Sequence, residues 1–193
     1  MATNNVRWLE DAGPETLSNG ISFGMPWSKG QYQRGDAFVI EGDGQQYSLD
    51  TREIAYWADG SLKWTAHSVS SNISYSDQYT VRRSREHQEP LKGVKVERNG
   101  LRISVSSRQG LHLTFCPPGS SSLLESLAID GRVVCTETAI VASIGENRYT
   151  SRVDTVEIEN ATFARAVVKA SGVVVGEAGE AHLPFDMRVY VYS

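Results

Sequence analysis

The chain has 193 residues, of which 40% are hydrophobic and 22% charged, and its formal net charge is −4. This composition is typical of a soluble globular protein with one large or two small domains. The acidic balance argues against a nucleic-acid partner, for which a basic stripe is expected, and no apolar run approaches the roughly 20 residues of a membrane helix.

Strand patterns recur along the chain, with Gly, Asn, Asp and Ser between them, and they predict an all-β protein of barrel or sandwich type. The only helix-like signal is a possible turn around Ser121–Ser126. In the first half, a short N-terminal strand is expected first. Further strands are expected at Ala37–Glu41, Gln46–Leu49, Thr51–Ala58, Leu62–Ser70 and Gln78–Arg83.

Residues 17–35 contain four glycines, which interrupt any regular strand. We therefore predict a short strand followed by a long loop that carries Trp27, Lys29 and Tyr32. Aromatic rings beside a cation in a flexible loop suit a ligand-binding lip. The alternative is that Trp27 closes one end of a barrel.

The strongest local signal is Asp59-Gly60 between two apolar runs, which predicts a two-residue type I′ hairpin turn. Such a turn pairs Ala55 with Trp64 and places Trp57 on the same face as Trp64. We expect both tryptophans to be core anchors, and a sugar-stacking surface is the alternative. The opposite face would carry Tyr56, Lys63 and His67.

A charged stretch from Arg82 to Glu89 has no apolar periodicity and ends at Pro90. Domain boundaries fall in polar linkers of this kind, so we place one near residues 86–92. The predicted domains are an N-terminal β-barrel at 1–88 and an antiparallel β-sandwich at 92–193.

In the second half, hairpins are predicted around Asn99-Gly100, with Glu97 opposite Arg102, and around Asp130-Gly131. Further strands are expected at Leu111–Phe115, Ala139–Ile144, Thr155–Ile158, Phe163–Val175 and His182–Tyr192. Because the last strand runs to Ser193 without a turn, we expect the sandwich to be incomplete at its C-terminus. Asp186, Arg188 and Tyr190 share one face of this strand, where we expect a simple Asp–Arg pair rather than a sugar-binding patch.

The sequence does not decide whether the two cysteines form a disulfide or are free thiols. As a disulfide, Cys116 and Cys135 would close a loop of about 20 residues and stabilise the fold by on the order of 3 kcal/mol. As free thiols they would act as small apolar groups. The four histidines have no metal-ligand spacing, and no phosphate or dinucleotide motif is present, so we expect no metal and no cofactor.

Three segments together resemble a known family. They are Trp57-x-Asp-Gly-Ser-x-x-Trp64, the preceding Gly20–Gly30 segment and the final Leu183–Tyr192 strand. They resemble the N-terminal part of the fungal exo-rhamnogalacturonan lyases and their bacterial YetA-like relatives. The resemblance implies a small β-barrel of the RIFT type, then a β-sandwich, with an α/α toroid that is missing from this chain.

The resemblance also implies a polysaccharide lyase that acts on pectin by β-elimination. Because the toroid is missing and no catalytic residue can be placed, we expect this chain to support or line the cleft. Its expected substrate-binding residues are Trp27, Lys29, Tyr32, Tyr56, Lys63 and His67. A cluster of Lys63, His67 and Tyr56 could supply a base and a cation, although an ordinary solvent face explains the same residues.

Two alternatives come from other functional classes. One is a free-standing carbohydrate-binding module that uses its tryptophans and tyrosines, and the other is a structural β domain without a ligand. The N-terminus lacks the features of a signal peptide, whereas sequons at Asn72 and Asn160 favour secretion. We expect an extracellular protein, with a cytoplasmic one as the alternative.

Overall fold

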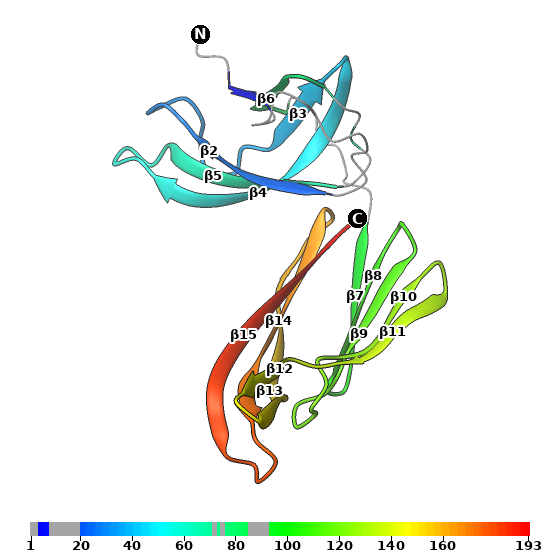
Figure 1. The fold of residues 1–193 in the computed structure, drawn as a ribbon. Coiled ribbons are helices and arrows are strands. Elements are labelled where there is room, and N and C mark those ends of the chain that lie inside the picture. The colour runs from blue at the N-terminus through cyan, green and yellow to red at the C-terminus, as the bar shows by residue number, and fades with distance from the viewer. Residues whose placement is uncertain (1–3, 8–19, 71–72, 74–75, 85–92) are drawn as a thin grey trace. The chain divides into compact units, whose positions relative to one another are not determined.

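The computed structural model describes residues 4–7, 20–70, 73, 76–84 and 93–193. The predicted linker near 86–92 and the sequon at Asn72 lie outside the described residues. Every helix or strand assigned to the described residues is a β-strand (Figure 1). The chain divides into two compact units, residues 1–92 with Tyr192 and residues 93–191 with Ser193. None of the described residues forms a helix that is long and apolar enough to cross a membrane.

The first unit is built on a six-stranded antiparallel sheet. Its strand order is β1 (Asn5–Val6), β6 (Tyr79–Arg83), β3 (Phe38–Gly42), β4 (Gln45–Tyr56), β5 (Leu62–Val69) and β2 (Ile21–Pro26). The long β4 strand joins two segments expected to be separate strands, because it pairs with β3 through its first half and with β5 through its second. The core consists of Met25, Trp27, Phe38, Ile40, Leu49, Leu62, Val69, Ile73, Tyr79 and Val81.

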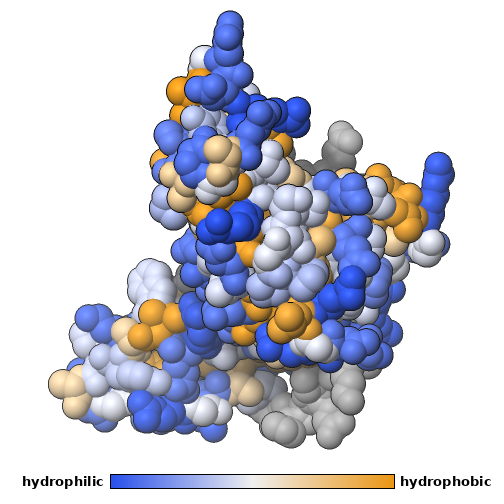
Figure 2. All heavy atoms as spheres, turned by 90° about the horizontal axis from the view of Figure 1, so that it is seen from below, coloured by the Kyte–Doolittle hydropathy of each residue, from blue (hydrophilic) through white to orange (hydrophobic). Residues whose placement is uncertain are grey.

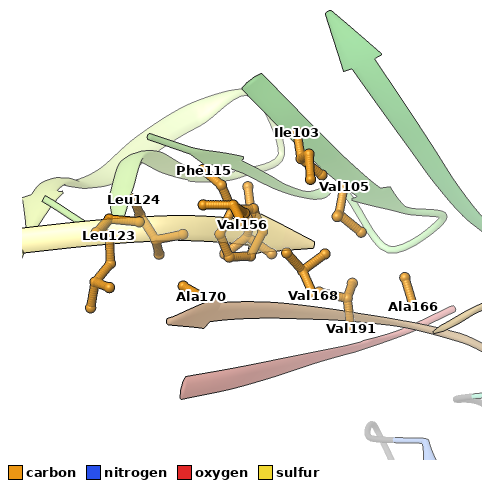
Figure 3. Close-up of a cluster of buried hydrophobic side chains, with 12 residues drawn as sticks. Ile103, Val105, Phe115, Leu123, Leu124, Val156, Ala166, Val168, Ala170 and Val191 are labelled. Carbon is orange, nitrogen blue, oxygen red and sulfur yellow. The ribbon is translucent and has the colours of Figure 1, made fainter. Parts of the chain in front are cut away.

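The second unit contains two antiparallel sheets. One has the order β11 (Arg132–Thr138), β10 (Leu124–Ile129), β9 (Leu111–Phe115), β8 (Arg102–Ser107) and β7 (Val94–Asn99). The other has the order β12 (Val141–Ile144), β13 (Asn147–Ala161), β14 (Arg165–Val175) and β15 (Ala181–Tyr192). Figure 3 shows side chains of both sheets meeting in one core, for example Phe115 and Ile103 with Val156 and Val168.

Two Asp-Gly turns close hairpins, and the one at Asp130-Gly131 forms as predicted. Asp43-Gly44 and Asp130-Gly131 each have a positive φ at both residues, which is the type I′ geometry. They close the β3–β4 and β10–β11 hairpins, where Gly42 pairs with Gln45 and Ile129 with Arg132.

The central Asp-Gly turn differs. Only Gly60 has a positive φ (84°), the Gly60 N–H donates to the Trp57 carbonyl, and the Trp57 N–H donates to the Ser61 carbonyl at 2.9 Å. The loop therefore has three residues, not two. The carboxylate of Asp59 holds it by accepting bonds from the N–H (3.1 Å) and hydroxyl (2.6 Å) of Ser61.

This longer loop shifts most of the pairing of β4 with β5 by one residue, and the register irregularities on either side of Ala55 break the alternation of β5. Leu62 is therefore buried, whereas Lys63 and Trp64 are both exposed. Thr65 and His67 are fully buried, whereas Trp64 is 42% exposed. The prediction that Trp64 is a core residue is therefore wrong. The predicted pair of Ala55 with Trp64 is kept only because register irregularities flank it on both sides.

Smaller corrections concern the second unit. Glu97 pairs with Ser104 rather than Arg102, because the loop is Gly100-Leu101; the shift of two residues leaves the predicted faces unchanged. The helix-like signal around Ser121–Ser126 corresponds to no helix, since β10 begins at Leu124. Both cysteines are free thiols, Cys116 buried and Cys135 exposed on β11.

Exposed hydrophobic side chains occur in both units, among them Trp64, Val133, Val134 and Leu183. On the face seen in Figure 2, hydrophobic residues form small groups between hydrophilic ones. A large single apolar patch, which would mark an extensive protein interface, does not stand out on that face.

Candidate functional site

The glycine-rich loop lies against the tip of the β4–β5 hairpin. The N–H of Gly30 donates to the Ser61 hydroxyl at 2.9 Å, and the N–H of Leu62 donates to the Tyr32 carbonyl at 2.9 Å. The N–H of Trp27 donates to the Lys63 carbonyl at 3.0 Å. We call residues 28–36 and 53–63 the rim; these bonds hold its two halves together.

Trp27 and His67 lie in the core below the rim. The indole N–H of Trp27 donates to the Thr65 hydroxyl at 2.8 Å, and that hydroxyl lies 2.7 Å from Nε2 of His67. Nδ1 of His67 lies 3.0 Å from the hydroxyl of Thr51. Burial lowers the pKa of His67 to about 4, so the ring is neutral at physiological pH.

These contacts show that the face predicted to carry Tyr56, Lys63 and His67 together does not form. His67 is fully buried and Lys63 is exposed, so the two do not form a base-and-cation cluster. Trp27 closes the core, as the alternative interpretation of this residue had it, and stacks on Phe38 with ring centroids 5.1 Å apart. Tyr32 is half-buried and packs edge-on against Trp27 at 4.7 Å.

The first exposed group of the rim is built around Glu53. Its carboxylate accepts bonds from the N–H of Gly35, at 2.7 Å, and from the hydroxyl of Tyr56. The guanidinium of Arg34 lies 4.3 Å from the centre of the Tyr56 ring. The bond from Tyr56 lowers the pKa of Glu53, and the same bond raises the pKa of Tyr56. At neutral pH the pair is therefore a carboxylate and a protonated phenol.

The second group of the rim is built around Trp57, which is half-buried and not the core anchor that was expected. The ammonium of Lys63 lies 4.8 Å from the centre of its ring, and its indole N–H donates to the Trp27 carbonyl at 3.0 Å. Lys29 is exposed on the adjoining loop. The pKa of Asp59 is lowered, mainly by the hydroxyl and N–H of Ser61 and to a smaller extent by the charge of Lys29.

The rim thus brings three of the predicted residues, Lys29, Tyr56 and Lys63, to one exposed edge of the first unit, and adds Arg34. The three carboxylates of the rim, Asp36, Glu53 and Asp59, already accept internal hydrogen bonds. The three cations are therefore the groups that suit an anionic ligand. Proton abstraction is not supported, because His67 is inaccessible and Glu53 is already hydrogen-bonded. Sequence reasoning missed Arg34, although it lies only two residues beyond Tyr32 in the same loop.

A second exposed feature is Trp64 on the outer face of β5. Its indole lies against Gly24 of β2: a Cβ on Gly24 would be 2.9 Å from the indole Nε1. The ring therefore lies along the sheet surface. A large flat aromatic surface of this kind suits stacking on an apolar ligand face. The signal in the sequence was a glycine inside a strand, which often marks close approach.

The face of β15 carries ion pairs in place of a sugar patch. Asp186 accepts a bond from the Ser171 hydroxyl at 2.6 Å and pairs with Lys169 at 3.1 Å. Arg188 donates two bonds to Glu159, at 2.7 and 2.8 Å. The expected Asp186–Arg188 pair is therefore wrong, since each residue has a different partner. Within the described part of the chain, no group of three His, Cys, Asp or Glu side chains is arranged to hold a metal ion.

Two family models match the chain consecutively. The family model of the PcRGLX-like N-terminal RIFT barrel domain matches residues 2–84, and that of the PcRGLX-like protein central beta sandwich domain matches residues 94–193. These matches confirm the predicted fold class. A Bacillus subtilis (strain 168) protein described as "Uncharacterized protein YetA" is 27% identical over 202 residues, which cover 97% of this chain. The match covers only 23% of that relative.

Proposed function

This chain belongs to the PcRGLX-like family, whose N-terminal RIFT barrel and central β-sandwich domains it comprises, and from this we propose that it is the β portion of a polysaccharide lyase. The proposed substrate is rhamnogalacturonan, a pectin polysaccharide. The consecutive match of both domain models carries the proposal. The chain matches less than a quarter of the relative's length, which supports the proposal that it is part of a longer parent enzyme.

The proposed reaction is β-elimination next to a galacturonate carboxylate. Such a reaction needs a base to remove the α-proton and a cation or metal to offset the charge on the carboxylate. The rim supplies Lys29, Arg34 and Lys63 but no accessible base. We therefore assign this chain a supporting role in which it lines the cleft, while an α/α toroid domain of the parent enzyme carries catalysis.

One assay tests the supporting role. Rhamnogalacturonan is incubated with residues 1–193 and, separately, with the full-length parent enzyme, and the absorbance of the unsaturated product is followed. We expect product only from the longer chain. Clear product from residues 1–193 alone would overturn the supporting role, and no product from either protein would overturn the lyase assignment.

The contact of the rim with substrate needs its own test. In the parent enzyme, Lys63→Ala and Arg34→Ala should raise KM severalfold and change kcat little, because they remove binding that is equal in ground and transition states. Lys95→Ala is the matched control, since Lys95 is an exposed lysine on β7 that pairs with Glu97. Unchanged KM in both rim variants would contradict a rim that contacts substrate.

A free-standing carbohydrate-binding module is the second candidate, and the exposed ring of Trp64 favours it. Titration of residues 1–193 with pectin oligosaccharides, followed by tryptophan fluorescence, distinguishes the candidates. A saturable shift that Trp64→Ala abolishes supports the module. A flat titration combined with self-association would favour a structural β domain instead.

We also propose that the protein acts outside the cell, because a pectin polymer is too large to be taken up intact. Fractionation of the native cells tests this. Recovery of the protein only from the cytoplasm would contradict it.

A further inference from the structure

The second unit contains a pocket that the proposed function does not use. Its volume is ≈ 240 Å³, and it lies at the start of β13, against the end of β14. Its polar and glycine lining residues include Gly119, Ser121, Arg148, Thr150, Arg152 and Glu177. We call it the β13 pocket.

The backbone fixes one wall of the β13 pocket. The strand β12 pairs with β13 only as far as Thr150. Beyond that point the loop before β10 takes its place: the N–H of Gly119 donates to the Val153 carbonyl at 2.7 Å, and the N–H of Val153 donates to the Ser120 carbonyl at 2.9 Å. The hydroxyl of Ser151 also donates to the Ser121 carbonyl at 2.7 Å. The wall is therefore preformed and not a mobile loop end.

The cations of the β13 pocket come from one strand face. Arg148, Thr150 and Arg152 are alternate residues of β13, so their side chains share a face, with about 13 Å between the outer two Cα atoms. Nε of Arg152 donates to Asp154 at 3.2 Å, which orients that guanidinium and leaves its terminal nitrogens available. Arg148 takes part in none of the ion pairs found among the described residues.

This set of groups selects a class of ligand. Guanidinium groups bind carboxylates through paired, charge-assisted hydrogen bonds. The hydroxyls of Thr150 and Ser121 and the carboxylate of Glu177 suit the hydroxyl groups of a sugar. The volume lies below the roughly 300–1,000 Å³ typical of pockets for drug-sized ligands, so it suits one sugar ring and not an oligomer.

We propose that the β13 pocket binds a single sugar-acid residue. Arg148 and Arg152 hold its carboxylate, while Thr150, Ser121 and Glu177 bind its hydroxyls. That this sugar acid is a galacturonate of pectin rests on the proposed function. That the pocket suits a sugar acid follows from its lining residues alone. The pocket is separate from the rim, since all of its lining residues belong to the second unit.

Direct binding to residues 1–193 tests the proposal without any turnover. Amide signals of Gly119 and Gly176 are followed by NMR during titration with galacturonate, with galactose and with acetate. Galactose has the same ring hydroxyls without the carboxylate, and acetate has only the carboxylate. We expect saturable shifts with galacturonate, and at least tenfold weaker binding of the other two.

Variants assign the carboxylate contact. Arg148→Ala should weaken galacturonate binding about tenfold, and Arg148→Lys should recover only part of it, because lysine cannot form the paired bonds. Arg132→Ala is the matched control at an exposed arginine on β11. No shifts with galacturonate, equal affinity for acetate, or equal loss in Arg132→Ala would each overturn the proposal. If the parent enzyme cleaves pectin but galacturonate does not shift these signals, the proposed role of the pocket is wrong and the lyase assignment stands. If galacturonate binds but the parent enzyme does not cleave pectin, the lyase assignment is wrong and the proposed role of the pocket stands.

Discussion

The indole of Trp64 lies so close to Gly24 on the neighbouring strand that a Cβ at position 24 would be 2.9 Å from Nε1 and 3.1 Å from Cζ2. Gly24 pairs with Ala66, and Trp64 pairs with Pro26, so the ring reaches diagonally across to Gly24 on the neighbouring strand. The glycine therefore determines that the ring lies along the surface, where 42% of the residue is exposed.

We expect Trp27, which directly follows β2, and Trp64 of β5 to differ in their contribution to stability. Trp64→Ala should lower the free energy of unfolding of the first unit by about 1–2 kcal/mol, because only part of the ring is buried. Trp27→Ala should lower it by about 3–5 kcal/mol, because it empties the core and leaves Thr65 without the indole donor. Urea titration followed by circular dichroism measures both. Equal losses would contradict the exposed position of Trp64.

Gly24 should depend on Trp64 in a double-mutant cycle. Gly24→Ala forces the indole to move and should destabilise the first unit by about 1 kcal/mol. In the Trp64→Ala background the same change should be neutral or slightly stabilising, since the obstacle is gone and alanine is favoured over glycine in a strand. Additive effects of the two changes would show that the ring does not lie on Gly24.

The stability of the first unit should fall in acid because of His67. Its pKa is about 4 in the folded protein, against an ordinary value of 6.5, so the unfolded chain takes up a proton first as the pH falls. The contribution of His67 is therefore complete above pH 6.5 and lost between pH 6.5 and 4, by about 3 kcal/mol in total. The rings of Phe23, Trp27 and Phe38 surround the imidazole at centroid distances of 5.3–6.1 Å and offer no countercharge.

The comparison of wild type with His67→Gln isolates this effect, because carboxylates titrate equally in both proteins. The variant should be less stable at neutral pH and should lose less stability between pH 6.5 and 4. Unfolding free energies from urea titrations at several pH values provide the measurement. Parallel curves for the two proteins would mean that His67 is not buried in its neutral form.

The two thiols should react at different rates. Cys135 is exposed on β11, whereas Cys116 is buried, and burial is the main cause that raises the pKa of its thiol. A thiol reagent at neutral pH should modify one cysteine per chain in the native protein and two in denaturant, as counted by mass spectrometry. Rapid labelling of Cys116 in the native state, or protection of Cys135, would contradict this placement.

Two Asp-Gly turns should respond in opposite ways to the same substitution. Asp130→Asn should leave the melting temperature unchanged or raise it, because asparagine is well suited to the first position of a type I′ turn. Asp59→Asn should lower it, because the carboxylate accepts two bonds from Ser61 in a turn of another type. Differential scanning calorimetry provides the comparison. A lower melting temperature only in the Asp130 variant would reverse the two turn assignments.

Much of the fold could be predicted from local patterns. Alternation of apolar and polar residues located most strands, and the face assignment of β7 and β8 survived a shift of two residues because side chains alternate with a period of two. Assuming the same period in β5 explains the main error. The register irregularities beside Ala55 break this alternation after Leu62, so Trp64 is exposed and His67 is buried.

The sequence by itself determined the all-β class, the hairpin at Asp130-Gly131 and the resemblance to a family. The tertiary structure decided the length of the central loop. Ser61 donates a bond to Asp59 inside this loop, and its hydroxyl accepts a bond from the N–H of Gly30, which lies 31 positions earlier in the chain. It also decided the β13 pocket, whose walls come from segments near residues 120, 150 and 176. A local sequence pattern cannot identify neighbours that are distant in the chain. The alternation of apolar residues predicts which side of a strand faces the core, but not which other segments pack next to that strand.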